Sequence, residues 1–189
     1  DKGLDVIRFL AGEPDFNTPE DIKEAAVRAI RNNHTRYGSN RGLFRLRQAI
    51  AGILAEECGV DYDPETEIIV TTGGAEAINN AFLALLDPGN EVIIPTPAFV
   101  SYENMAYMCG AEPVPVPLLL KDGFQLDVRE VEKRITSRTR MIVINNPCNP
   151  TGAVYARETL EKLSELAIKH DLIVFSDEIY NRLTYNGGF

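Results

Sequence analysis

Short apolar segments alternate with amphipathic segments along the whole chain. The apolar runs, several of them rich in Val and Ile, predict strands at Val6–Leu10, Glu67–Thr72, Glu91–Pro95, Pro113–Pro117, Met141–Asn145 and Leu172–Ser176. The segments between them have apolar residues at helical spacing and predict helices at Glu20–Arg31, Leu43–Cys58, Ala75–Leu86, Ser101–Cys109, Val128–Arg134 and Glu158–His170. This alternation predicts the α/β fold class, with a mostly parallel sheet flanked by helices.

Polar residues gather where the last two predicted strands end. The first of these strands runs into Asn145-Asn146-Pro147-Cys148-Asn149-Pro150-Thr151-Gly152, and the second runs into Ser176-Asp177-Glu178-Ile179-Tyr180. The helix predicted between them makes a β-α-β unit, in which both strands are parallel. Because ligands bind at the carboxyl ends of parallel strands, the pattern predicts a polar ligand site there.

A third strand end carries glycines. Thr71-Thr72-Gly73-Gly74-Ala75-Glu76-Ala77 follows an apolar strand and opens a helix. Glycine lets the backbone approach an anion closely, and the free N–H groups of a first helical turn point at it. The segment therefore predicts a phosphate site.

Each of these motifs has a simpler explanation when taken alone. Asp177 and Glu178 could complement the dipole of a helix N-terminus, and Asn149-Pro150-Thr151-Gly152 could be an ordinary turn. A Gly-Gly pair at a strand-to-helix turn also relieves steric crowding without any ligand. Their occurrence together, in this order and at strand ends, favours a common site.

Composition limits the classes of protein. The chain has 189 residues, 44% hydrophobic and 25% charged, which indicates one soluble globular domain without a membrane span. Three scattered cysteines indicate a reducing compartment, and we expect a cytoplasmic protein. A net charge of −9 argues against a nucleic-acid partner. We interpret the local arginine cluster as a solvated face; it comprises Arg28, Arg31, Arg36, Arg41, Arg45 and Arg47.

Metal binding is not indicated. His34 and His170 have no metal-binding partners at ligand spacing, so we expect surface or capping roles for them and no metal site.

The paired motifs at the last two strand ends resemble the pyridoxal-phosphate-dependent aminotransferases of class I/II, which have fold type I. The resemblance implies pyridoxal 5'-phosphate as cofactor, with Asp177 paired to the protonated ring nitrogen. It implies that Asn149 and Tyr180 hydrogen-bond the phenolic oxygen of the ring, and that Phe99 stacks on the ring. The phosphate is then assigned to the backbone of Gly74, Ala75 and Glu76, with the Glu76 carboxylate turned away.

Two earlier segments extend the resemblance. Gly12, in Ala11-Gly12-Glu13-Pro14-Asp15, matches a loop that meets the substrate carboxylate, and Asn149 is also assigned to the substrate. Tyr37 matches a tyrosine that reaches the cofactor phosphate of a neighbouring subunit, which implies a homodimer with shared sites. Residues 1–18 are expected to belong to the small domain and substrate loop. Residues 19–189 are expected to form the cofactor-binding large domain, which is incomplete.

The resemblance leaves the catalytic residue outside this sequence. The Schiff-base lysine of the family follows the Ser176–Tyr180 motif by a few dozen residues, so it is expected beyond Phe189, and none of the six lysines present matches its motif. No catalytic residue is therefore assigned here. We expect a parent enzyme that moves an amino group between an amino acid and a 2-oxo acid, and an inactive chain when it is taken alone.

Two other functions remain open on the same fold. One is a cofactor-dependent carbon–sulfur lyase, because close relatives of the scaffold run β-elimination. The other is the non-catalytic effector domain of a transcription regulator.

Overall fold

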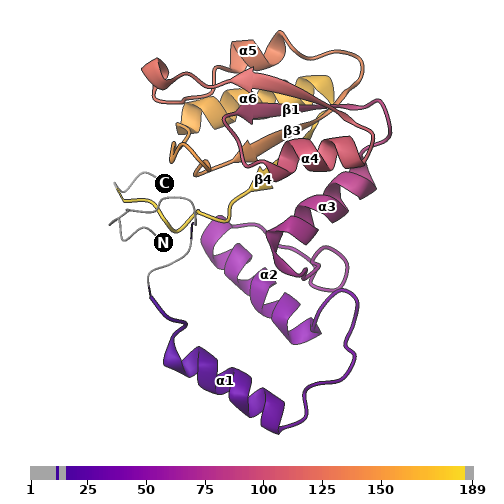
Figure 1. Ribbon diagram of the computed structural model, residues 1–189, viewed down its shortest axis with the longest axis vertical. Coiled ribbons are helices and arrows are strands. Elements are labelled where there is room, and N and C mark those ends of the chain that lie inside the picture. Colours follow the sequence, from indigo (N-terminus) through magenta and orange to yellow (C-terminus); the bar gives the residue numbers. More distant parts are fainter. Residues whose placement is uncertain (1–11, 13–15, 186–189) are drawn as a thin grey trace, which may run out of the picture. The chain divides into compact units, whose positions relative to one another are not determined.

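The computed structural model describes Gly12 and residues 16–185, and the chain divides into two compact units, Asp1–Val70 and Thr71–Phe189 (Figure 1). The first unit contains the helices α1 (Glu20–Arg31) and α2 (Phe44–Cys58). The predicted strand Val6–Leu10 lies outside the described residues. The predicted boundary between residues 18 and 19 stays a prediction.

Arg47 corrects one interpretation of the arginine cluster in the first unit. Its side chain is buried rather than solvated: Nε donates to the carbonyl of Gly42 at 3.3 Å, and Nη1 donates to the carbonyls of Pro64 and Glu65. A guanidinium can be buried when its N–H groups find acceptors in this way. Arg47 therefore holds the loop before α2 against the segment after it.

The predicted strand Glu67–Thr72 is not a strand in the structure. Its start belongs to a turn in which the N–H of Glu67 donates to the carbonyl of Asp63 at 2.9 Å. The N–H of Val70 then donates to the carbonyl of Arg41 at 3.0 Å, which joins the segment to a loop. An apolar run becomes a strand only when a partner strand supplies a ladder of hydrogen bonds, and no described strand lies beside this run.

The second unit is built on a four-stranded parallel sheet. Its strands are β1 (Glu91–Thr96), β2 (Glu112–Pro117), β3 (Thr139–Asn145) and β4 (Ile173–Asp177), in the order β2-β1-β3-β4. Its α-helices are α3 (Gly73–Leu85), α4 (Ser101–Met108), α5 (Val128–Glu132) and α6 (Arg157–His170), and Leu120–Asp122 forms one 3-10 turn, η1. The predicted α/β class with a mostly parallel sheet flanked by helices is confirmed.

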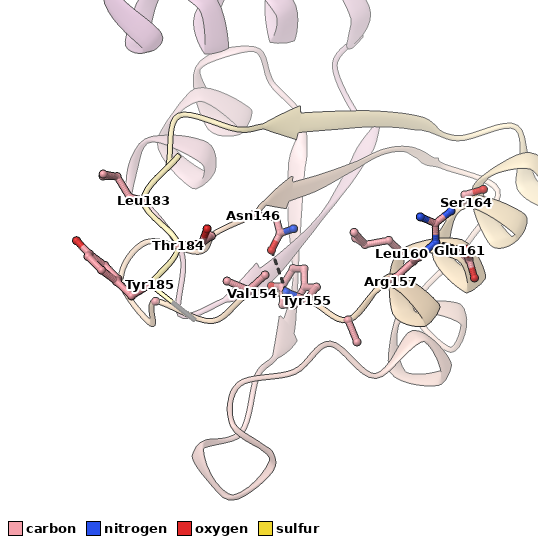
Figure 2. A pocket seen from close by; sticks show the side chains of 12 residues that line it. Asn146, Val154, Tyr155, Arg157, Leu160, Glu161, Ser164, Leu183, Thr184 and Tyr185 are labelled. Carbon is pink, nitrogen blue, oxygen red and sulfur yellow. Dashed lines mark hydrogen bonds and ion pairs between the residues drawn. The ribbon is translucent and has the colours of Figure 1, made fainter. Parts of the chain in front are cut away.

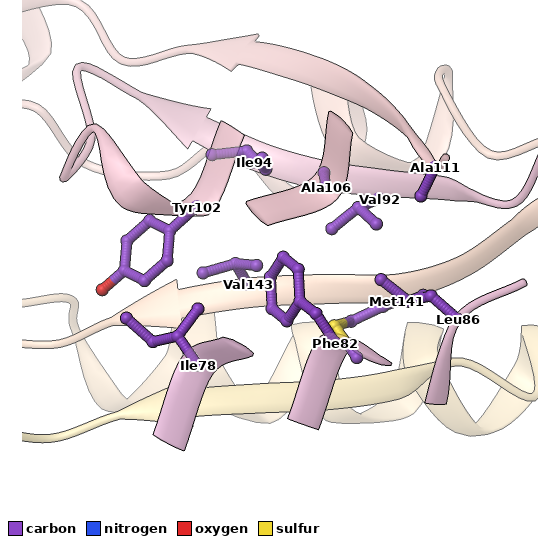
Figure 3. Close-up of a cluster of buried hydrophobic side chains, with 10 residues drawn as sticks. All are labelled: Ile78, Phe82, Leu86, Val92, Ile94, Tyr102, Ala106, Ala111, Met141 and Val143. Atoms are coloured by element: carbon purple, nitrogen blue, oxygen red, sulfur yellow. The ribbon is translucent and has the colours of Figure 1, made fainter. Parts of the chain in front are cut away.

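Alternation of side chains along the strands gives the sheet two buried faces. One face packs against α3 and α4, as Figure 3 shows, through Ile78, Phe82, Leu86, Val92, Ile94, Tyr102, Ala106, Ala111, Met141 and Val143. The opposite face uses the intervening residues Ile93, Ile142 and Ile144 and packs against Val131 of α5 and Leu163 of α6. A parallel sheet buried on both faces needs such continuous apolar strands.

Proline occupies alternate positions of the edge strand β2. The N–H groups of Glu112 and Leu118 donate, at 2.8 and 2.7 Å, to carbonyl groups just before β1 and at its end. Since successive residues of a strand alternate in direction, Pro113, Pro115 and Pro117 face the outer edge. Proline is tolerated there because it has no N–H to contribute to a ladder.

No helix in the described part of the chain, Gly12 and residues 16–185, is long and apolar enough to span a membrane.

Candidate cofactor site

A cavity of about 450 Å³ opens in the second unit where β3 and β4 end. Its volume is within the range of small-molecule sites. Its lining combines residues of the first turns of α3, aromatic rings and polar residues of the two strand ends: Gly74, Ala75, Ala77, Ile78, Phe99, Tyr102, Asn145, Asn149, Phe175, Ser176, Asp177, Glu178, Ile179 and Tyr180. Six of the predicted cofactor residues thus lie around one cavity: Gly74, Ala75, Phe99, Asn149, Asp177 and Tyr180.

The two strand ends are joined by their own polar groups. In the sheet, Asn145 at the end of β3 pairs with Asp177 at the end of β4. The Asn145 amide donates to the main-chain carbonyl of Asp177 at 3.1 Å, and its side-chain oxygen accepts the N–H of Asn149 at 2.7 Å. Asn145 is buried, so these bonds satisfy a side chain that would otherwise be costly to bury.

Asn149 and Tyr180 meet at one point of the cavity. The Asn149 amide Nδ2 donates to the Tyr180 hydroxyl at 3.3 Å, and both side chains are half-buried. An amide N–H and a phenolic O–H that converge in this way can both donate to one acceptor oxygen. The two residues are 31 positions apart in the sequence.

Three neighbours besides Asn145 hold Asp177 in place. Its Oδ2 accepts a hydrogen bond from the Tyr102 hydroxyl at 2.6 Å, and its Oδ1 accepts the N–H of Ile179 at 3.2 Å. The N–H of Asn146 donates to its main-chain carbonyl at 3.1 Å. A carboxylate lining this cavity is suited to pairing with a cationic group of a ligand.

The first turn of α3 contributes backbone to the cavity. Gly74 and Ala75 line it, whereas Glu76 does not. The Glu76 carboxylate instead accepts the N–H of Thr72, just before the helix, and this hydrogen bond holds the pKa of Glu76 below its ordinary value. The carboxylate is thus engaged beside the helix start, away from the cavity lining.

Tyr102 has a larger role than its sequence context indicates. It is a buried residue that both lines the cavity and hydrogen-bonds Asp177. Burial, followed by the bond to Asp177, raises the pKa of the Tyr102 hydroxyl far above its usual range. Asn145 is a second contributor without an assigned role in the sequence. No local signal links either residue to Asp177, because both contacts cross between elements.

Gly12 and Tyr37 belong to the first unit. Both are exposed there, and a Cβ built on Gly12 meets nothing within 4 Å. Their assignment to substrate carboxylate and neighbouring phosphate stays a prediction.

A larger cavity of about 950 Å³ lies beside α6 in the same unit (Figure 2). Its lining includes Val154, Leu160, Leu183 and Tyr185 but none of the predicted cofactor residues. Its charged side chains, Arg157 and Glu161, pair with each other at 2.8 Å. Size alone therefore does not locate the chemistry, because the converging polar groups lie in the smaller cavity.

Comparison with known proteins gives one consistent result. The family model "Aminotransferase class I and II" matches residues 4–188. The aspartate/prephenate aminotransferase of Thermus thermophilus is 47% identical over 98% of this chain and 48% of its own length. The chain spans about half the length of the curated relatives it matches.

Solved structures agree with the sequence comparison. The aromatic aminotransferase of Pyrococcus horikoshii superposes with a TM-score of 0.92 and is 46% identical, covering 95% of this chain and 48% of that one. The Thermus thermophilus aspartate aminotransferase with maleate superposes with a TM-score of 0.91 and is 48% identical, covering 94% of this chain and 46% of that one. The parallel sheet, the polar groups at its strand ends and these matches lead to one conclusion: the chain belongs to the class I and II aminotransferase family.

Proposed function

We propose that the cavity at the ends of β3 and β4 binds pyridoxal phosphate. The groups that line the cavity fit this cofactor. A carboxylate can pair with the ring nitrogen, an amide and a phenol can donate to the ring oxygen, and an aromatic face can stack on the ring. A helix N-terminus can bind the phosphate. The observation that carries the proposal is that one cavity collects Gly74, Phe99, Asn149, Asp177 and Tyr180. When bound, this cofactor acts as an electron sink for the substrate carbanion.

Each residue has a separate part in this proposal. The Asp177 carboxylate accepts a hydrogen bond from the protonated ring nitrogen, and this charge-assisted bond keeps the nitrogen protonated. Asn149 and Tyr180 donate to the phenolic oxygen, and Phe99 fixes the tilt of the ring through its face. The N–H groups of Gly74, Ala75 and Glu76 bind the phosphate at the start of α3.

We propose aminotransfer between an amino acid and a 2-oxo acid as the activity of the protein that carries this chain. The relatives support this activity over the lyase and regulator alternatives, since the curated matches are named as aminotransferases. Gly12 and Asn149 are proposed to meet the substrate. Tyr37 is proposed to reach the phosphate of a second subunit in a homodimer. The three free cysteines support a reducing, cytoplasmic location.

Replacement of Asp177 tests the proposal. In the protein that carries this chain, Asp177→Ala should reduce aminotransfer by orders of magnitude, because the ring nitrogen loses the group that keeps it protonated. The matched control is Asp171→Ala, which removes an exposed carboxylate just before the same strand and should leave the rate unchanged. Aminotransfer is measured as glutamate formed from 2-oxoglutarate and a donor amino acid. Unchanged activity in Asp177→Ala would refute the assignment.

A further inference from the structure

Tyr102 links two elements at the candidate site. It lies in the first turn of α4, its side chain is only 1% exposed, and its hydroxyl reaches β4 to donate to Asp177 Oδ2 at 2.6 Å. A hydrogen bond this short between a neutral phenol and a carboxylate belongs to the strong, charge-assisted class. The two residues are 75 positions apart, so the bond exists only because the fold brings α4 and β4 together.

Two kinds of contact restrain Asp177. Hydrogen bonds from Asn145 and Asn146 to its carbonyl fix its backbone at the end of the strand. The rotation of its carboxylate is restrained separately, by Tyr102 on Oδ2 and by the N–H of Ile179 on Oδ1. The bond from Ile179 is longer, at 3.2 Å against 2.6 Å. Removal of the Tyr102 hydroxyl would therefore leave the carboxylate with the longer bond from Ile179, while the bonds to its backbone carbonyl remain.

The ring of Tyr102 is itself held in place by aromatic neighbours. It packs edge-to-face against Phe99, with ring centroids 5.8 Å apart, and against Phe175 at 6.4 Å. Its backbone N–H also donates to the carbonyl of Phe99 at 3.2 Å. Because burial raises its pKa, the hydroxyl stays protonated, and so remains a donor, across the working pH range of an enzyme. Tyr102 is thus a rigid donor that contacts both Asp177 and Phe99.

We propose that Tyr102 is a positioning residue, whose hydroxyl fixes the rotation of the Asp177 carboxylate so that it meets the ring nitrogen of the bound cofactor. This inference rests on the pyridoxal phosphate site proposed above. It adds to that site a residue that acts on the cofactor through Asp177. Loss of a residue that only packs in the core would weaken every ligand of the cavity equally. Loss of a positioning residue would instead weaken the ligand whose ring nitrogen meets Asp177, and this difference makes the proposal testable.

The test compares two ligands that differ at one atom. The ligands are pyridoxal phosphate and its deaza analogue, in which C–H replaces the ring nitrogen. Equilibrium dialysis measures the affinity of each for the protein that carries this chain. Tyr102→Phe keeps the aromatic packing and removes the hydroxyl. It should weaken pyridoxal phosphate binding about five- to tenfold, which is within the net effect of one ordinary hydrogen bond, and leave the binding of the deaza analogue within about twofold.

Tyr155→Phe is the matched control. Tyr155 is also a buried tyrosine in the same unit, but it does not line the candidate cofactor cavity. Its variant should leave the ratio of the two affinities unchanged. If Tyr102→Phe does not fold, as judged by circular dichroism, site-specific fluorotyrosine at position 102 retains both ring and hydroxyl. The fluorotyrosine hydroxyl is the more acidic donor, so this protein should keep or increase the preference for pyridoxal phosphate.

The outcomes separate this inference from the proposed function. If the unaltered protein does not bind pyridoxal phosphate, or Asp177→Ala leaves the preference over the deaza analogue intact, the proposed site and the role of Tyr102 both fail. If Asp177→Ala abolishes the preference and Tyr102→Phe retains it, the site stands and Tyr102 is a packing residue. Equal weakening of both ligands in Tyr102→Phe, or loss of the preference in the fluorotyrosine protein, also overturns the positioning role.

Discussion

Asn145 connects the two strand ends through opposite ends of one amide. Its nitrogen donates to the Asp177 carbonyl, and its oxygen accepts the N–H of Asn149, so the two proposed cofactor residues share one buried support. A side chain with both a donor and an acceptor can do this, whereas a carboxylate or a hydrocarbon of similar size cannot. The spacing of the two motifs is thereby fixed by a residue outside the set assigned to the cofactor.

Asn145→Ala should therefore destabilise the protein. The change leaves the partly buried N–H of Asn149 without its acceptor, which costs about 1–3 kcal/mol in the free energy of unfolding. Urea denaturation followed by circular dichroism measures this difference. Asn104→Ala, at an exposed position of α4, is the control and should be close to neutral. Equal stability of the two variants would contradict the supporting role of Asn145.

Glu76 gives a pH-dependent prediction. Its pKa is lowered in the folded state, chiefly by the N–H of Thr72, from an ordinary value of 4.5. A carboxyl whose folded pKa is depressed contributes stability above its unfolded pKa and loses that contribution as the pH falls through the folded pKa. The melting temperature of Glu76→Gln should thus lie below that of the unaltered chain near neutral pH, and the gap should close below about pH 4.5.

Glu165→Gln is the control for this pH series. Glu165 is exposed in the middle of α6. Any difference in melting temperature between Glu165→Gln and the unaltered chain should therefore not depend on the Thr72 contact. A gap for Glu76→Gln that is constant between about pH 3 and pH 7 would show that the Thr72 contact does not stabilise the folded state.

Some residues of the candidate site could be placed from the sequence, and others could not. Asn149, Asp177 and Tyr180 could be placed together because they follow parallel strands, whose carboxyl ends lie at one edge. Tyr102 could not be connected to Asp177 in the same way. Its contact depends on how α4 packs on the sheet, and side-chain reach across a helix–strand interface is not encoded in local periodicity.

At the scale of elements, α3 connects the core to the cavity. Ile78 and Phe82 are buried against the sheet on one face of this helix (Figure 3). The first turn of the helix lines the cavity. The Phe82 ring is fully buried and meets Phe175 of β4 edge-to-face at 5.5 Å. The position of the proposed phosphate site therefore depends on apolar packing several residues away.

Phe82→Ala should cost about 3–5 kcal/mol in the free energy of unfolding, because it removes a fully buried ring and leaves a cavity. Leu83→Ala is the matched control: Leu83 is the next residue of α3 but is 58% exposed. Its replacement should cost about 1 kcal/mol or less. Chemical denaturation of the two variants gives the comparison, and similar losses would contradict the burial of the Phe82 face.

Helices and strands of the second unit agree with the sequence pattern to within a few residues, since their apolar periodicity is strong and is matched by packing on both faces of the sheet. Glu67–Thr72 was predicted wrongly as a strand. Its apolar residues satisfy the local preference, but a strand also needs a partner along its length, and the sequence of one segment cannot specify that partner.

At the scale of the whole molecule, Tyr37 tests the proposed homodimer. In the protein that carries this chain, Tyr37→Phe should weaken cofactor retention by roughly 1.5–3 kcal/mol, the value of one hydrogen bond to a charged group. The dimer itself should persist. Equilibrium dialysis measures retention, and sedimentation velocity measures the assembly state.

Tyr62→Phe provides the comparison for this prediction. Tyr62 belongs to the same unit as Tyr37, and 42% of it is exposed, so loss of its hydroxyl should leave cofactor retention unchanged. A monomer that keeps full activity at nanomolar concentration would exclude a shared site.

The prolines of β2 bear on how molecules of this protein behave when crowded together. An exposed sheet edge with free N–H and C=O groups is a template on which another chain can add a strand, and such addition starts intermolecular aggregation. The outward positions of β2 are Pro113, Pro115 and Pro117, so that edge presents acceptors without donors. An incoming strand would find acceptors but no donors at these positions, so fibre-like growth of the sheet is disfavoured at this edge.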